Sequence, residues 1–143
     1  MKSYFPDINI WLALVYQGHE HHSIAGRWLD EVEEAEVCFS RFTQLGFLRL
    51  LTHSSIMRSD VKNLREAWSV YDSILKDSRI IFANEPPTGD LDRLLRKFSS
   101  SGEVSPKKWT DAYLAAFAHA SGMELITFDR SLAQISHPST LLG

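Results

Sequence analysis

Three aspartates stand at positions where a carboxylate could take part in chemistry. Asp7 directly follows an apolar run that predicts a strand, and Asp129 follows a second such run. Asp111 lies within residues 109–118, which are nearly apolar on all sides and predict a largely buried helix. A buried carboxylate costs several kcal/mol unless a cation or several hydrogen-bond donors compensate it. These three residues therefore indicate either a functional site or specific structural partners.

Each aspartate also has a structural interpretation. Asp7 and Asp129 precede predicted helical segments, and aspartate is among the most favourable N-cap residues. Asp111 falls in the second turn of its helix, where the macrodipole favours negative charge and where an Arg or Lys partner would compensate the carboxylate. Considered one at a time, the three positions do not separate a structural role from a catalytic one.

Considered together, the three aspartates predict a cation site. Strands of a parallel α/β sheet end at the edge where helices begin, and ligands bind in the crevice there. Asp7, Asp111 and Asp129 all belong to that edge, where converging carboxylates repel one another unless a positive charge lies between them. Mg²⁺ and Mn²⁺ are the hard cations that oxygen ligands favour. Such an ion generates hydroxide from water and neutralises a phosphodiester, which predicts a phosphodiesterase or nuclease.

The elements that would position these aspartates alternate between short apolar runs and longer helical periodicities. Strands are predicted at residues 2–7, 37–40, 79–83 and 124–128, with a short edge strand at 140–142. Helices are predicted at residues 8–17, from 22 onward, and at 43–53, 61–76 and 90–99. A last helix has Ser105 as its N-cap, Pro106 at its first position and Gly122 as its stop. The alternation predicts an α/β fold, a three-layer α/β/α sandwich with a central, mostly parallel sheet, in a single domain of residues 1–143.

Two of the predicted helices carry apolar stripes. In the helix at 43–53, Leu45, Leu48 and Leu51 are expected to point inward. In the helix at 61–76, Trp68 and Tyr71 belong either to the core or to a dimer surface, and the sequence does not separate the two.

Composition excludes several classes of protein. The 143 residues include 15 Lys and Arg against 18 Asp and Glu, and the net charge of −3 argues against a domain that coats nucleic acid electrostatically. The single Cys38 excludes an intrachain disulfide and a cysteine-based zinc site. No apolar run is long enough to span a bilayer, and the N-terminus lacks the apolar core of a secretory signal. A cytoplasmic protein with no membrane association is expected.

The ordered motifs resemble those of the PIN-domain family and, more narrowly, the VapC ribonuclease toxins of bacterial toxin–antitoxin modules. The resemblance is carried by PDIN at 6–9, WTDAYLA at 109–115 and TFDR at 127–130, and it covers essentially the whole chain. It implies a parallel sheet flanked by helices and a Mg²⁺-dependent endoribonuclease, with Mn²⁺ as the alternative ion. It also implies a homodimer and inhibition by a cognate VapB-type antitoxin that occludes the acidic groove.

The same resemblance assigns roles to individual residues. Asp7 and Asp111 match the direct metal ligands, and Asp129 matches a third acid that orients metal-bound water. Asn9 and Thr127 match supporting positions of the same motifs. All three acids are therefore expected to be catalytic.

One departure from the family pattern concerns the helix after the second strand. The family commonly has a Glu there, whereas this chain has Gln44 or Gly46, depending on the alignment. Gln44 is taken as a supporting residue, because its carbonyl can accept a hydrogen bond or bind a cation but adds no charge. The missing charge weakens the case for a second metal ion and for high activity. Glu85, the nearest other acid after a strand, is a weak substitute.

Other polar residues fit ordinary surface roles. The HEHH segment at 19–22 suggests a metal site, but no second ligand pair at helical spacing accompanies it, so a solvated helix start or a packing surface is predicted. Lys107, Lys108 and Arg41 precede or follow the predicted rim elements. They are expected either to be solvated or to grip RNA phosphates on either side of the scissile bond.

Two other functions remain open. The missing Glu is compatible with a catalytically weak PIN-like module that only binds RNA or a protein partner. An aspartyl phosphotransferase is less favoured, because such enzymes need a second Asp two residues after the first, where this chain has Asn9.

Overall fold

The computed structural model describes all residues from Met1 to Gly143. The strands are β1 (Lys2–Pro6), β2 (Ala35–Phe39), β3 (Ile80–Phe82), β4 (Glu124–Thr127) and β5 (Ser139–Leu141). The helices are α1 (Ile8–Val15), α2 (His22–Glu31), α3 (Arg41–Leu51), α4 (Ser54–Met57), α5 (Leu64–Ile74), α6 (Thr88–Phe98), α7 (Lys107–Ala120) and α8 (Arg130–Ile135), with a 3-10 turn, η1, at Arg58–Asp60. Every predicted strand is present, whereas α4 and η1 were not predicted. No helix combines the length and the apolar character needed to cross a lipid bilayer.

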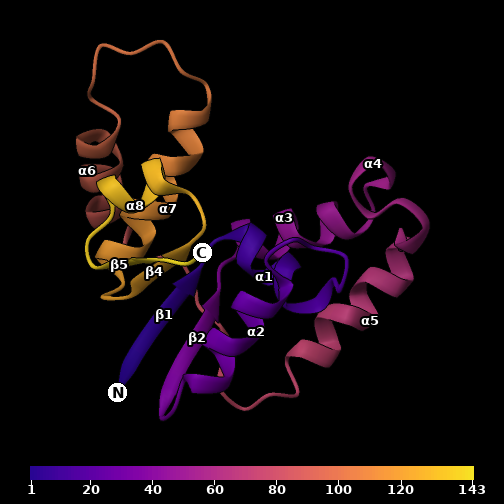
Figure 1. The fold of residues 1–143 in the computed structure, drawn as a ribbon. Helices are drawn as coiled ribbons and strands as arrows, with labels where there is room; N and C mark the ends of the chain where they lie inside the picture. The colour runs from indigo at the N-terminus through magenta and orange to yellow at the C-terminus, as the bar shows by residue number, and fades with distance from the viewer.

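The five strands form one sheet in the order β3-β2-β1-β4-β5, and every pair is parallel. Because the strands run in one direction, their carboxyl ends share a single edge (Figure 1). β1 is the central strand, and Pro6 at its end pairs with Ile126 in β4. This register brings the residues that follow β1 and β4, including Asp7 and Asp129, to neighbouring places on that edge.

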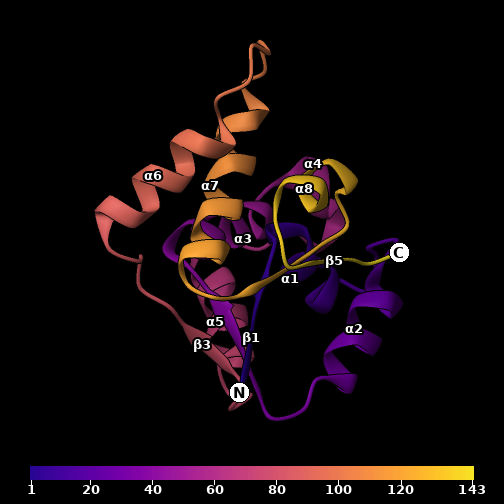
Figure 2. The same ribbon diagram turned by 90° about the vertical axis from the view of Figure 1, so that its left-hand side faces the viewer.

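Helices cover both faces of the sheet, which confirms the three-layer α/β/α sandwich. Tyr4, Val37 and Phe39 pack in the core that includes helices α1, α3 and α5. The alternate residues Phe5 and Cys38 point to the opposite face and pack with α6, α7 and α8. The two helical layers lie on either side of the sheet in Figure 1, and Figure 2 shows α6 and α7 side by side.

Capping boxes fix the beginnings of two helices. Ser40 accepts a hydrogen bond from the Thr43 backbone N–H, and the Thr43 hydroxyl accepts one from the Ser40 backbone N–H, at the start of α3. Asn63 and Glu66 make the same reciprocal pair at the start of α5. This second box explains why α5 begins at Leu64 rather than at the predicted residue 61.

The start of α7 differs from its prediction. The helix begins at Lys107, and the Ser105 side chain makes no capping hydrogen bond. Pro106 already has helical dihedral angles, as expected for a proline at a helix start. Ser105 contributes its carbonyl instead, which accepts a hydrogen bond from the Lys108 backbone N–H at 3.1 Å.

An apolar face formed by Leu45, Leu48, Leu64 and Trp68, termed the α3–α5 face, is partly open to solvent. Leu45 is 56% exposed, Leu64 76% and Trp68 47%. The expectation that Leu45 points inward is therefore wrong, whereas Leu51 is buried as expected. The apolar stripe on α3 is wider than the part of the helix that the core covers. The uncovered residues of this stripe line a shallow hollow of about 330 Å³ between α3 and α5.

Candidate active site

Asp7 lies between β1 and α1 and is both a helix cap and a half-buried carboxylate. Its Oδ1 accepts a hydrogen bond from the Asn9 backbone N–H at 3.4 Å, as the N-cap interpretation predicts. Its Oδ2 accepts a second one from the Thr127 hydroxyl at 2.8 Å. No Lys, Arg or His forms an ion pair with it. Burial raises the pKa of Asp7 despite these donors, so its charge is not fully compensated by the protein.

Thr127, the last residue of β4, connects two of the aspartates. Its fully buried hydroxyl donates to Asp7 Oδ2 and accepts a hydrogen bond from the Asp129 backbone N–H at 2.9 Å. One hydroxyl therefore holds the ends of β1 and β4 together at the edge of the sheet. This contact is consistent with the supporting role expected for Thr127.

Lys107, in the first turn of α7, lies between the other two aspartates. Its Nζ donates to Asp111 Oδ2 at 2.9 Å and to Asp129 Oδ2 at 2.6 Å. The hydrogen bond with Asp129 is the main cause that raises the pKa of Lys107. The Asp111 side chain is only 7% exposed, so the buried carboxylate does have a lysine partner, as its structural interpretation predicts.

Asp129 is held on both of its oxygens. Oδ1 accepts hydrogen bonds from the backbone N–H of Ser131 at 2.9 Å and from its hydroxyl at 2.7 Å, which caps α8. Oδ2 receives the Lys107 ammonium. Burial by itself would raise the pKa of Asp129, but the bonds from Lys107 and Ser131 outweigh it and lower the pKa to about 2.

These contacts link Asp7, Asp111 and Asp129, termed the acid group, at the carboxyl edge of the sheet. The linkage runs from Asp7 through Thr127 to Asp129, and from Asp129 through Lys107 to Asp111. The positive charge within it is an ammonium, and no three His, Cys, Asp or Glu side chains have the spacing of a preformed metal site. The three segments thus approach one another as expected, with Lys107 between two of the acids.

The donor set of the acid group fits a hard divalent cation. All its ligating atoms would be carboxylate oxygens, which Mg²⁺ and Mn²⁺ prefer. Asp7 is half-buried without a cation partner, and a bound dication would supply the missing charge. Lys107 is 61% exposed, so its flexible side chain can turn into solvent and release the oxygens of Asp111 and Asp129.

The two candidate positions for the missing Glu have very different surroundings. A Cβ atom at Gly46 would overlap the side chain of Ile8, so a larger residue at position 46 would have to displace that side chain between α3 and α1. Gln44 is buried in the first turns of α3, and its Oε1 accepts a hydrogen bond from Arg41 Nη1 at 2.6 Å. Position 44 is therefore the one that can hold a longer polar side chain.

Glu85 is engaged elsewhere. Its Oε2 accepts a hydrogen bond from the Tyr113 hydroxyl at 2.6 Å, and it contacts no member of the acid group through a hydrogen bond or ion pair. Burial, followed by this bond to Glu85, raises the pKa of Tyr113. Glu85 therefore does not replace the acid that Gln44 lacks.

A cleft of about 390 Å³ opens beside the acid group. Its lining consists of Asp7, Asn9, His19, Glu20, His21, Phe128 and Asp129. The HEHH segment, predicted as a solvated helix start or a packing surface, thus brings three of its residues to the candidate site. The spacing of these residues carried no signal of this, because the contact joins the loop after α1 to the end of β4, which is remote in sequence.

Of the three cations expected near the rim, only Lys107 contacts the acid group. Arg41 bonds Gln44 and lies over the ring of Phe82, with 4.7 Å between the guanidinium carbon and the ring centroid. Lys108 faces Glu103, with 4.0 Å between Nζ and Oε1. The position of a lysine along a helix therefore decides its role, since Lys107 and Lys108 are neighbours in sequence and point to different partners.

The sequence profile of the PIN domain matches residues 4–138, nearly the whole chain. The chain belongs to the PIN-domain family. This PIN domain is 43% identical over 132 residues to Ribonuclease VapC41 of Mycobacterium tuberculosis, and the alignment covers 90% of each protein. It is 31% identical over 145 residues to Ribonuclease VapC44 of the same organism, with 92% of this chain and 89% of that protein covered. The PIN domain is therefore of the VapC type, as the motifs predicted.

Solved structures share the fold of this PIN domain. The crystal structure of VapC20 from Mycobacterium tuberculosis, described as a sarcin-ricin loop cleaving toxin, superposes with a TM-score of 0.66 at 20% identity, covering 92% of this chain and 93% of that one. VapBC2 from Rickettsia felis, bound to a DNA fragment from its promoter, gives a TM-score of 0.70 at 16% identity over 99% of each chain. These likenesses agree with the α/β sandwich described above.

Proposed function

We propose that this PIN domain is a metal-dependent endoribonuclease and the toxin of a type II toxin–antitoxin module. The observation that carries the proposal is the acid group: Asp7, Asp111 and Asp129 come from three distant segments and are linked at one sheet edge. The 43% identity to Ribonuclease VapC41 supports RNA as the substrate. The reaction is hydrolysis of a phosphodiester by attack of water on phosphorus.

Mg²⁺, or Mn²⁺ in its place, is the cofactor of the proposed reaction, and Asp7 and Asp111 are its ligands. When bound, such an ion would lower the pKa of water and neutralise negative charge on the phosphate. Thr127 orients Asp7 by donating to Oδ2. Ser131 and the start of α8 hold Asp129 through Oδ1, which leaves Oδ2 to orient the attacking water once Lys107 has turned away. Asn9 and Gln44 keep their assignment as supporting residues.

The proposed partners are a VapB-type antitoxin, which would cover the acid group, and a second copy of this chain. The α3–α5 face supports the homodimer, because the large apolar side chains of Leu45, Leu64 and Trp68 are exposed around one hollow. We place the protein in the reducing cytoplasm, where the single buried thiol of Cys38 remains free.

The test is cleavage of labelled single-stranded RNA by the purified chain with Mg²⁺, with Mn²⁺ and with EDTA. We expect products with either ion, none with EDTA, and none from Asp111→Asn in any condition. A calorimetric titration with Mn²⁺ should show binding to the wild type and not to Asp111→Asn. An Asp7→Asn, Asp111→Asn double variant that cleaves as fast as the wild type would refute the proposal.

The second candidate is a catalytically weak module that binds RNA or a protein partner. The observation that favours it is Gln44, because this buried neutral side chain is bonded to Arg41 and leaves the sheet edge with one carboxylate fewer. The Mn²⁺ titration separates the two functions. Absence of detectable binding, together with retained RNA affinity, would favour the weak module.

A further inference from the structure

We propose that the cleft beside the acid group is a subsite for an unpaired guanine base of the RNA, next to the scissile phosphate. This inference rests on the proposed ribonuclease function and names a base that the same site would select. His19, Glu20, His21 and Phe128 line this cleft together with Asp7 and Asp129. Its volume of about 390 Å³ is within the range of small-molecule sites, roughly 300–1,000 Å³.

The aromatic rings of the cleft form a stacking platform. The ring of Phe128 lies 4.5 Å from that of His21 and 5.9 Å from that of His19, measured between centroids. All three side chains are only half-buried, so part of the cluster remains accessible. Unpaired RNA bases bind by stacking on such rings. Phe128 directly precedes Asp129, so a base on this platform has its own phosphate within reach of the acid group.

A hydrogen bond within the loop fixes the ring of His19. Its Nδ1 accepts the backbone N–H of His21 at 3.0 Å, and the neutral ring therefore carries its proton on Nε2, a donor for a base carbonyl. Because Nδ1 is already used, this ring is not a free metal ligand on that side.

Glu20 supplies the selectivity. Its side chain is 82% exposed, and its Oε1 lies 3.2 Å from His21 Nε2, which keeps the carboxylate beside the rings. An ionised carboxylate only accepts hydrogen bonds. Guanine presents two adjacent donors, N1–H and the N2 amino group, to the two carboxylate oxygens, and its O6 can accept from His19 Nε2. Adenine and cytosine place an acceptor beside their amino group, and uracil has one donor between two carbonyls.

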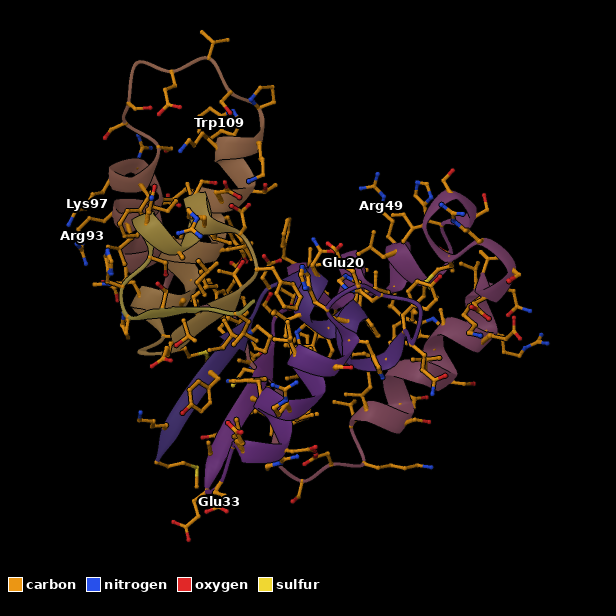
Figure 3. The ribbon with its side chains drawn as sticks, viewed as in Figure 1. Glu20, Glu33, Arg49, Arg93, Lys97 and Trp109 are labelled. Carbon is orange, nitrogen blue, oxygen red and sulfur yellow. The ribbon has the colours of Figure 1, made fainter.

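A second glutamate offers a matched control. Figure 3 shows Glu20 between the two helical layers, near the carboxyl edge of the sheet, whereas Glu33 lies at the opposite end of the molecule. Glu33→Gln removes the same charge as Glu20→Gln without touching the cleft. His53, an exposed residue before α4, serves in the same way for His19→Ala.

The experiment measures binding of four labelled uridine octamers, each with G, A, C or U at one central position, by fluorescence anisotropy in EDTA. EDTA removes the metal and prevents cleavage. We expect the G octamer to bind about tenfold more tightly than the other three. Glu20→Gln should reduce this preference to less than about twofold, and Glu33→Gln should retain it. His19→Ala and Phe128→Leu should weaken binding of the G octamer about tenfold, while His53→Ala should not.

Equal affinity for the four octamers, no measurable binding to any of them, or an unchanged preference in Glu20→Gln would overturn the subsite. Unfolding midpoints of the variants serve to exclude a folding defect, and Phe128→Leu preserves apolar volume for the same reason. Cleavage assays separate the two proposals. Guanine preference without cleavage in Mg²⁺ or Mn²⁺ would overturn the ribonuclease and keep the subsite, whereas cleavage without base preference would do the reverse.

Discussion

Two carboxylate–cation groups in this molecule are built in opposite ways. At the start of β3, Arg79 Nε and Nη2 donate to the two oxygens of Asp77 at 3.0 and 2.6 Å. Arg79 Nη1 also donates to the carbonyls of Leu29 and Val32 at 2.7 Å each. This second group therefore fastens the end of α2 to the sheet through a pair separated by two residues in sequence.

The acid group is compensated unevenly. Lys107 bridges Asp111, which lies four residues along the same helix, and Asp129 at the start of α8, whereas Asp7 has neutral donors and no cation. In the Asp77 group every contact holds the fold, whereas the Asp7 carboxylate of the acid group has no cation and remains available to a ligand. Incomplete compensation, rather than the presence of an acid or an ion pair, distinguishes a candidate site from a structural bridge.

The largest effect is expected from Asp7→Asn. Loss of this proposed metal ligand should lower the proposed metal-dependent RNA cleavage by more than about 100-fold, beyond the effect of losing an outer partner. Because burial raises the pKa of Asp7, the neutral amide should leave the unfolding midpoint unchanged or higher. Asp77→Asn is the contrasting variant and should cleave like the wild type. Equal losses of activity in both variants would remove the distinction between the two groups.

A smaller loss is expected from Thr127→Val. The isosteric change removes the donor to Asp7 and leaves the Asp129 backbone N–H without its acceptor. Cleavage should fall about 10–100-fold, as for other partners that orient metal ligands. Thr52→Val is the matched control, because the Thr52 hydroxyl bonds only carbonyls at the end of α3. Initial cleavage rates of the two variants provide the comparison.

Lys107→Met tests whether the lysine ammonium competes with a metal ion in the acid group. Removal of the ammonium frees the oxygens of Asp111 and Asp129, so Mn²⁺ should bind more tightly, by about tenfold, which corresponds to about 1.4 kcal/mol. Calorimetric titration of both proteins measures the change, and Lys108→Met is the neighbouring control. Weaker Mn²⁺ binding in Lys107→Met would show that the lysine supports the ion rather than competing with it.

The smallest effect concerns stability at the Asp77 group. The side-chain hydrogen bond from Arg79 is the main cause that lowers the pKa of Asp77. A lowered folded-state pKa stabilises the protein above the unfolded value near 4, and the contribution disappears as pH falls through the folded value. Asp77→Asn should cost about 1 kcal/mol at pH 7, since the pair is partly exposed, and less at about pH 3, which lies below the unfolded-state pKa. Urea unfolding at the two pH values measures both differences.

Much of the frame of the site follows from local sequence. The apolar runs before Asp7 and Asp129 predicted the strands, and parallel strand direction then placed both residues at one edge. Lys107 as the bridge was not predicted, although its spacing of four residues from Asp111 is the ordinary signal of a helical ion pair. This spacing identifies the pair of Lys107 and Asp111. It does not identify Asp129, which contacts Lys107 only because the tertiary structure brings the two segments together.

The remaining differences have physical causes that a single sequence does not encode locally. The inward orientation expected for Leu45 was wrong, because an apolar residue on a helix does not reveal how much of the stripe the core covers. The place of His19 and His21 beside Phe128 depends on how the loop after α1 folds across the sheet edge. Both depend on packing between remote segments rather than on propensity.

The Lys107 bridge has a consequence for biogenesis. A chain leaving the ribosome carries its own counter-ion for Asp111 and Asp129, so two of the three aspartates can assemble before any metal arrives. Folding of the chain and binding of the proposed metal ion then become separate events. Under the proposed function, a newly made molecule can reach its final shape before it holds the ion on which cleavage depends.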